Sequence, residues 1–276
     1  MASQLLQGKK GIIFGALDER SIAWKTALAA HEAGAQLVLT NAPIALRMGK
    51  INELSKLCGD APVIPADATS MTDIENLLQK SMETFGGKID FMLHSIGMSP
   101  NVRKNIEYTG TNYDNFHKTL DISALSLHRI LQSAMNLDAL NEWASVVALS
   151  YIAAQRTFPG YNDMADAKAL LESITRSFGY YYGFKKKVRV NTISQSPTVT
   201  TAGSGVSGFD VFLSYAEKMS PLGNASAEDC ANFCVTMFSD YTRMITMQNL
   251  FHDGGFSMTG VSQAIVEDEQ KLASGV

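Results

Sequence analysis

A tyrosine and a lysine seven positions apart, Tyr161 and Lys168, first suggest chemistry in this sequence. A turn at Pro159-Gly160 precedes them, and the following residues predict a helix that begins at Tyr161. Seven residues fall about 20° short of two helical turns, so both side chains leave one face, about 10 Å apart along the axis. Because a cation favours the phenolate, we expect Lys168 to lower the pKa of Tyr161. The alternative is a buried tyrosine and a solvated lysine on an ordinary helix.

A second tyrosine, Tyr151, lies ten positions before Tyr161. It follows the apolar run Ser145–Leu149, which predicts a buried strand that ends at Ser150-Tyr151. The two tyrosines therefore flank the junction at which a strand passes the chain to a helix. In a parallel α/β sheet, this junction is where ligands bind.

The elements that must position these residues alternate along the whole chain. Seven apolar runs predict strands: 9–15, 35–40, 62–66, 89–96, 145–149, 188–193 and 247–252. Helical patterns between them cover about 22–34 (capped by Ser21), 47–57, 69–85, 113–137, 161–184, 210–219 and 227–238. The pattern predicts one doubly wound α/β domain of the Rossmann type over residues 1–276, with a seven-stranded parallel sheet flanked by helices. A loop and helices at about 195–220 would cover the substrate, and residues 266–276 form a polar tail.

The strand ends provide the candidate site, since ligands lie beyond the carboxyl ends of such strands. These ends are Gly15, Thr40-Asn41, Asp67, Ile96-Gly97, Ser150-Tyr151, Ser194–Pro197 and Asp253-Gly254. Glycine at Gly15 and Gly97 lets a ligand approach the backbone closely. The helix that Ser21 opens offers N–H groups and a positive dipole end to a phosphate. The G-x-G-x-x-G pattern itself is absent.

Composition excludes several classes of protein. A chain of 276 residues with 46% hydrophobic residues builds a large core, and its net charge of −4 gives no basis for binding nucleic acid. Cys58, Cys230 and Cys234 show no metal-ligand spacing, so we predict no metal site and a reducing, cytoplasmic location. No apolar run approaches 18 residues, which argues against a membrane span. The first strand starts too early to leave room for a secretory segment.

Six segments together resemble the NADH-dependent enoyl-[acyl-carrier-protein] reductases, a divergent branch of the short-chain dehydrogenase/reductases in bacterial fatty-acid synthesis. They are Gly15-Ala16 with Ser21–Ala23, Ser95–Gly97, Leu149–Tyr151, Tyr161-x6-Lys168, Val188–Asn191 and Asp253–Ser257. The similarity runs from about Gly8 to Ser257 in one order. The Tyr-x6-Lys separation discriminates, because better-known relatives carry Tyr-x3-Lys.

The resemblance implies a reaction and its residues. Reduction of a trans-2-enoyl thioester delivers hydride to Cβ and leaves an enolate oxygen that needs a hydrogen-bond donor. By similarity, Tyr161 is that donor, Tyr151 is the second active-site tyrosine, and Lys168 holds the nicotinamide ribose. Ser99 would lie beside the substrate.

The resemblance also implies the cofactor contacts. Gly15, Ser21 and Ile22 would meet the pyrophosphate, Asp67 and Ala68 the adenine, and Ile96 and Gly97 the middle of the dinucleotide. The segment Thr198, Val199, Thr200, Thr201 and Ala202 would close over the nicotinamide and the substrate. Read alone, Asp67 is a helix N-cap ahead of Met71.

Departures from the family pattern leave several points open. No acidic residue follows the second strand, where Thr40-Asn41 stand, and Arg47 could meet a 2′-phosphate, so NADPH is possible beside NADH. The family's Ser-Ala-Gly-Pro-Ile reads Ser-Gln-Ser-Pro-Thr at 194–198, a more polar substrate loop. Basic residues for docking an acidic carrier protein are missing near Ser207, which leaves Arg103-Lys104 as candidates.

Two alternative functions remain. One is a carbonyl or ketoacyl reductase of the same superfamily, and the other is a non-catalytic nicotinamide-sensing protein on this fold. The resemblance further implies a homotetramer built through the faces of long helices. His94, inside an apolar strand, is interpreted as a buried structural histidine rather than a catalytic one.

Overall fold

The computed structural model describes residues 4–200 and 209–274. Within them, one parallel sheet has the strand order β2-β1-β3-β4-β5-β6. Its strands are β1 (Lys10–Phe14), β2 (Gln36–Thr40), β3 (Ile89–His94), β4 (Leu140–Ser150), β5 (Arg189–Gln195) and β6 (Asn249–His252). The chain leaves β1 for β2 on one side and returns to β3 on the other side. This reversal makes the ends of β1 and β3 the topological switch point of a doubly wound fold.

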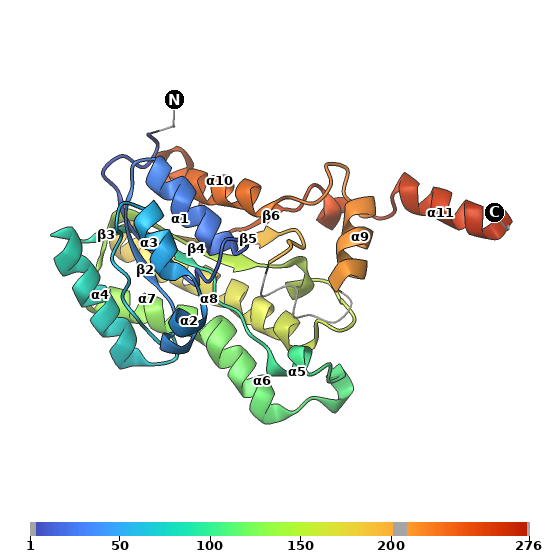
Figure 1. Cartoon of the computed structure of the whole chain (residues 1–276), viewed down its shortest axis with the longest axis horizontal. Helices are drawn as coiled ribbons and strands as arrows, with labels where there is room; N and C mark the ends of the chain where they lie inside the picture. Colours follow the sequence, from blue (N-terminus) through green and yellow to red (C-terminus); the bar gives the residue numbers. More distant parts are fainter. Residues whose placement is uncertain (1–3, 201–208, 275–276) are drawn as a thin grey trace.

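Helices cover both faces of the sheet (Figure 1). The longer ones are α1 (Ile22–Glu32), α4 (Met71–Phe85), α6 (Tyr113–Leu120), α7 (Ser126–Asn136), α8 (Asn162–Lys186), α9 (Phe209–Met219), α10 (Ala227–Phe238) and α11 (Gln263–Ser274). Short helices are α2 (Pro43–Met48), α3 (Ile51–Leu57) and α5 (Pro100–Arg103). None of the helices in these ranges is long and apolar enough to cross a membrane.

Two apolar cores fill the space between the sheet and its helices. Alternate residues of each strand point to opposite faces, so Ile13 joins the core beneath α1 and α10, while Ile12 joins the core beneath α4, α7 and α8. Both isoleucines are fully buried. Parallel strands buried on both faces read as continuous apolar runs, which is why the sequence predicted them well.

The predicted strand 62–66 is the main error in the fold. In the part of the chain that the structure describes, six strands form where seven were expected, and this segment contributes one isolated bridge, between Leu39 and Val63. It still lies beside β2, because Leu39 N donates to Pro62 O and Ile64 N donates to Leu39 O. Pro62 and Pro65 have no N–H to donate, so a regular ladder cannot extend through them.

The helix predicted for 113–137 forms without a break in the helical path, but its middle differs. A π-turn over Asp121–Leu125 joins α6 to α7. Here Ser123 Oγ accepts from Met98 N at 2.9 Å and donates to Met98 O at 3.1 Å. π-Turns are often found at functional sites, and this one fastens the segment that follows β3.

Other differences are small. The helix predicted at 47–57 is two helices, α2 and α3, and β4 begins at Leu140. The predicted polar tail forms α11, which extends away from the rest of the chain in Figure 1 and has no buried residue among those described.

Candidate active site

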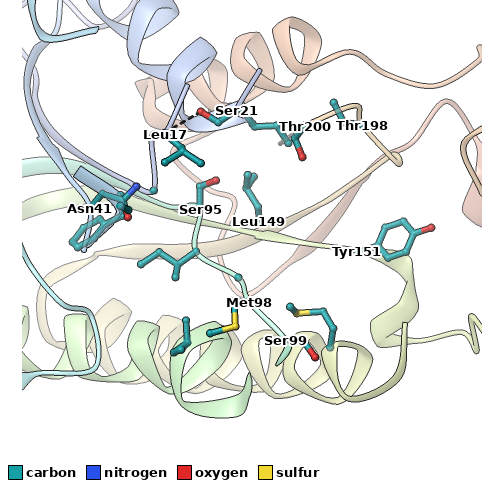
Figure 2. Close-up of a pocket in the computed structure, with 18 of the residues that line it drawn as sticks. Leu17, Ser21, Asn41, Ser95, Met98, Ser99, Leu149, Tyr151, Thr198 and Thr200 are labelled. Carbon is teal, nitrogen blue, oxygen red and sulfur yellow. Dashed lines mark hydrogen bonds between the residues drawn. The ribbon is translucent and has the colours of Figure 1, made fainter. Parts of the chain in front are cut away.

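A cavity of about 1040 Å³ opens along the carboxyl ends of the parallel strands. It is lined from Asn41 and Ala42 after β2, past Gly15 and Gly97, to Tyr151 and Tyr161. In Figure 2, Asn41 and Tyr151 lie at opposite sides of this space, with Ser21 above it and Ser99 below. The sheet therefore produces an elongated site at the switch point, as the topology predicted.

Most residues predicted for the site line this one cavity. They are Gly15, Ser21, Ile22, Asp67, Ala68, Ile96, Gly97, Ser99, Tyr151, Tyr161, Lys168, Thr198 and Thr200. Val199 is not among the lining residues and is 53% exposed. Thr201 and Ala202 lie outside the described residues. The individual roles of all these residues remain predictions.

Gly15 and Gly97 both line the cavity, but the absence of a side chain has a different effect at each. Gly15 has φ +92°, and a Cβ there would lie 2.1 Å from Ser95 O. Glycine is thus required at position 15 for the backbone after β1 to approach the backbone after β3 so closely. At Gly97 a Cβ would stand 3.8 Å from Lys168 Nζ, an ordinary contact. Gly97 leaves room above the lysine rather than permitting a strained turn.

The predicted helix cap at Ser21 is confirmed. Its Oγ accepts from Trp24 N and Leu17 N, each at 3.3 Å, and donates to Asp18 O at 2.8 Å. Figure 2 marks the bond to Leu17. The cap fixes the loop between β1 and α1 so that the positive end of the helix dipole faces the cavity.

The alternative interpretation of Asp67 as a helix cap is wrong. Ser70 caps α4 instead, by accepting from Asp73 N. Asp67 Oδ1 accepts from Thr69 N at 2.9 Å and from Thr69 Oγ1 at 2.8 Å. This local turn holds the exposed carboxylate at the rim of the cavity.

The tyrosines meet where β4 passes the chain toward α8. The rings of Tyr151 and Tyr161 contact edge to face, with centroids 5.1 Å apart. Burial raises the pKa of both phenols, and in Tyr151 the neighbouring Tyr161 and Asp253 raise it further. The expectation that Lys168 lowers the pKa of Tyr161 is therefore wrong. Desolvation in the apolar pocket prevails over the distant cation, and both phenols stay protonated hydrogen-bond donors.

Lys168 is buried, with 8% of its surface exposed. Its Nζ donates to Leu149 O at 2.7 Å, one residue before the end of β4. Burial lowers the pKa of the ammonium to about 8, and Glu172 opposes the shift. The lysine is thus still mainly cationic at neutral pH.

Ser99 lines the cavity as expected, and its hydroxyl also has a local structural part. Its Oγ donates to Asp163 Oδ1 at 2.6 Å and accepts from Val102 N at 3.0 Å. The other oxygen of the fully buried Asp163 accepts from Asn101 and Thr119, each at 2.8 Å. A buried carboxylate is tolerated only with such partners. Asp163 therefore ties α5 and α6 to the start of α8, and the Ser99 proton is already committed.

His94 is buried at the end of β3, and its Nε2 lies 2.8 Å from Ser126 Oγ. Burial, assisted by Lys168, lowers the pKa of its imidazole to about 3. A neutral, hydrogen-bonded imidazole agrees with the structural interpretation given to this histidine.

Several lining residues escaped sequence reasoning. Phe158 and Phe212, whose ring centroids are 6.2 Å apart, form an apolar wall together with Met164 and Ile122. Ile122 enters through the π-turn, which no sequence pattern signalled. Phe158 stands beside the Pro159-Gly160 turn, and its aromatic character in a polar loop was the one available signal.

The polar departure at Gln195 turns out to be structural. Gln195 is 4% exposed, its Oε1 accepts from His252 Nδ1 at 2.7 Å, and its Nε2 donates to Ala225 O at 3.1 Å. The last strand end in the prediction, Asp253-Gly254, does not line the cavity. There Asp253 accepts from Gly255 N and Ser257 N, which closes a turn.

The lining fits a dinucleotide. The cavity is long, glycine opens it at two points, the start of α1 faces it, and a buried ammonium stands near one end. Phosphates bind such helix starts, and ribose hydroxyls can accept from an ammonium. The tyrosine end is apolar and aromatic, which suits a substrate with a hydrocarbon chain.

Comparisons with known proteins agree with this geometry. A family model described as enoyl-(acyl carrier protein) reductase matches residues 15–257. The enoyl-[acyl-carrier-protein] reductase [NADH] 1 of Rhizobium meliloti (strain 1021) is 33% identical over 268 residues, 97% of each chain. The crystal structure of the FabI–NADH complex from Alistipes finegoldii is 64% identical and superposes with a TM-score of 0.93, covering 95% of this chain and 92% of that one. A FabI of Aquifex aeolicus (strain VF5) is 34% identical over 93% of this chain and 94% of its own length. The chain belongs to the enoyl-(acyl carrier protein) reductase family.

Proposed function

We propose that this protein reduces the trans-2 double bond of enoyl thioesters carried on acyl carrier protein, with NADH, in fatty-acid elongation. The observation that carries the proposal is the placement of Tyr151, Tyr161 and Lys168 at one end of a dinucleotide-sized cavity. Bound NADH supplies the hydride.

Tyr161 is the donor to the thioester oxygen. As hydride reaches Cβ, negative charge develops on that oxygen, and a protonated phenol stabilises it with a hydrogen bond. Burial keeps the phenol protonated. Tyr151, in edge contact with Tyr161, holds the ring in place and lines the acyl pocket.

Lys168 holds the ribose next to the nicotinamide and keeps the local potential positive. Its Nζ is fixed by Leu149 O, and Gly97 leaves space above it. An ammonium has three donors, so Nζ can keep that bond and still reach ribose hydroxyls.

NADH is favoured over NADPH at the other end of the cavity. Arg47, the candidate for a 2′-phosphate, is exposed and is not a lining residue. Among the cations that line the cavity, Lys50, which follows α2, pairs with Glu19 at 2.8 Å. The side chain of Asn41 is used locally, by donating to Ala16 O and accepting from Ala42 N. An added phosphate would meet no uncommitted cation among these residues.

The test is oxidation of NADH by purified protein with crotonyl and dodecenoyl thioesters, compared with NADPH under the same conditions. Turnover of the enoyl substrates with NADH supports the proposal. Preferred turnover of acetoacetyl thioester would indicate a ketoacyl reductase. Binding of NADH by calorimetry with no turnover of either substrate would indicate a sensing protein.

The carrier protein docks, in this proposal, beside Arg103 and Lys104. Both are exposed, and Arg103 lines the mouth of the cavity. Reversal of both charges to glutamate is expected to raise KM for a carrier-linked substrate and to leave KM for a short free thioester unchanged. Lys80→Glu, an exposed residue of α4, is the control.

We also propose a homotetramer in the cytoplasm. Tyr180, Tyr181 and Phe184 on α8 are 50%, 67% and 75% exposed, and the ring of Tyr180 contacts the other two. Exposed aromatic patches of this kind support self-association. Light scattering should give four chains, and Phe184→Glu should lower that mass. The cytoplasmic location is supported by the three cysteines, which are buried and unpaired with one another.

A further inference from the structure

Glu172 is a buried carboxylate to which the proposed reaction assigns no part. It lies on α8 one helical turn after Lys168, and 5% of its surface is exposed. Buried carboxylates are costly unless hydrogen bonds satisfy them. The partners of Glu172 therefore indicate what it is retained for.

Those partners precede and follow Tyr151 in the sequence. Glu172 Oε1 accepts from Ser150 Oγ at 2.7 Å, and Oε2 accepts from Gln155 Nε2 at 3.0 Å. Ser150 is the last residue of β4, and Gln155 ends the short 3-10 helix over Ile152–Ala154. The two oxygens of one carboxylate thus clamp the segment that carries Tyr151.

Lys168, one turn before Glu172 on α8, binds the same segment by donating to Leu149 O. Consecutive turns of α8 are therefore fastened to residues 149, 150 and 155 around the tyrosine. In this way one helix positions both the proposed donor, Tyr161, and its ring neighbour, Tyr151.

The carboxylate also acts on the charge of Lys168. Titratable groups around this end of the cavity are Glu172 on α8, Tyr161 just before α8, Tyr151 after β4, Asp253 after β6 and His94 on β3. His94 and both phenols are neutral at pH 7, and Asp253 acts on Tyr151. The negative charge of Glu172 is the one that favours protonated Lys168.

We infer that Glu172 is a positioning residue for the proposed reductase, which clamps the Tyr151 segment through Ser150 and Gln155 and keeps Lys168 cationic for NADH. This inference rests on the proposed function. Its two parts can be separated, because the clamp depends on the reach of the carboxylate and the charge effect depends on its sign.

The experiment compares Glu172→Gln, Glu172→Asp and Ser150→Ala with the wild type. The readouts are NADH affinity by fluorescence from pH 6 to 10, enoyl-thioester turnover, and thermal melting.

In Glu172→Gln, we expect kcat/KM to fall about 10- to 100-fold and the alkaline loss of NADH affinity to move to lower pH. Glu172→Asp should keep the pH of that loss, since the charge remains, but should lose turnover because the shorter side chain cannot reach both partners. Ser150→Ala should lower turnover by less, with the pH dependence unchanged.

Asp240→Asn is the matched control, because it removes an exposed carboxylate paired with Lys9 far from the cavity. It should behave as the wild type in both readouts. Wild-type turnover and wild-type pH dependence in Glu172→Gln would overturn the inference. If Glu172→Gln does not fold, unchanged turnover in both Glu172→Asp and Ser150→Ala would overturn it. Failure of the wild type to reduce enoyl thioesters would instead reject the proposed function, while the pH dependence of NADH affinity still tests the link between Glu172 and Lys168.

Discussion

The rings of Tyr151 and Tyr161 meet edge to face at 5.1 Å, although ten positions separate them in the sequence. One ring follows the end of β4 and the other stands at the start of α8. Packing of this kind contributes about 0.5–1.5 kcal/mol beyond area burial. Because the contact belongs to the rings and the hydrogen-bond donor is the hydroxyl, substitution by phenylalanine should separate the two contributions.

Tyr161→Phe should lower kcat with enoyl thioester by about 100- to 1000-fold, the typical effect of removing one donor to a developing oxyanion. The ring and its contact with Tyr151 remain, so the melting temperature should change little. Steady-state kinetics and calorimetry check the two parts. Tyr241→Phe, at an 82% exposed tyrosine, is the control and should match the wild type. A fall in kcat of less than threefold would contradict the donor role.

Tyr151→Phe should lower kcat/KM about tenfold or less, because the wall formed by the ring stays in place. Tyr151→Ala should lower kcat/KM further, since the ring contacts with Tyr161 and Phe158 are both lost. Kinetics on crotonyl and dodecenoyl thioesters measure the difference. Equal losses in the two variants would show that the hydroxyl, rather than the ring, matters at Tyr151.

NADH affinity should weaken as the pH rises through about 8, the pKa that burial gives Lys168. The sign follows from the charge: below this pKa the ammonium is present to hold the ribose, and above it the neutral amine is a weaker donor. We expect about a tenfold loss of affinity between pH 7 and pH 9.5. Lys168→Met should bind weakly with no such pH dependence, and Lys168→Arg should also lose it because arginine stays charged. A flat wild-type profile would contradict the prediction.

Gly15→Ala should destabilise the protein by about 2–4 kcal/mol, since it combines a positive φ with a Cβ placed 2.1 Å from Ser95 O. Gly97→Ala should leave the melting temperature nearly unchanged, because its Cβ would meet only ordinary contacts. It should weaken NADH binding, because the added methyl group would occupy cavity space beside Lys168 Nζ. Denaturant unfolding and NADH titration of both variants separate stability from binding. Similar unfolding free energies for the two would refute the distinction.

Much of the fold could be predicted because parallel strands are buried on both faces and the helices are capped. The stretches 12–14, 91–93 and 146–149 are apolar without interruption, and Ser21 marks a helix start that the structure confirms. The segment predicted as a strand at 62–66 forms only an isolated bridge, because Pro62 and Pro65 have no N–H for the ladder. Both prolines stand in the sequence, but the prediction followed the apolar pattern alone. The π-turn at Asp121–Leu125 was not predicted, because the apolar period of the sequence continues through it.

The sequence by itself determined which residue types stand at the strand ends, and it predicted that Tyr161 and Lys168 face one cleft. Both do line the cavity, although α8 begins only at Asn162, whose φ is +44°, so Tyr161 precedes the helix. These properties are local, since they depend on periodicity, capping and the conformational freedom of glycine. Only the tertiary structure decided the charge states and the partners. Burial raised the pKa of Tyr161, where spacing had suggested a fall, and it committed the Ser99 hydroxyl to Asp163. The tertiary structure also brought the Glu172 carboxylate to Ser150 and Gln155, which flank Tyr151 in the sequence. Desolvation and hydrogen bonding depend on groups that are distant in the chain and near in space, and no local pattern records them.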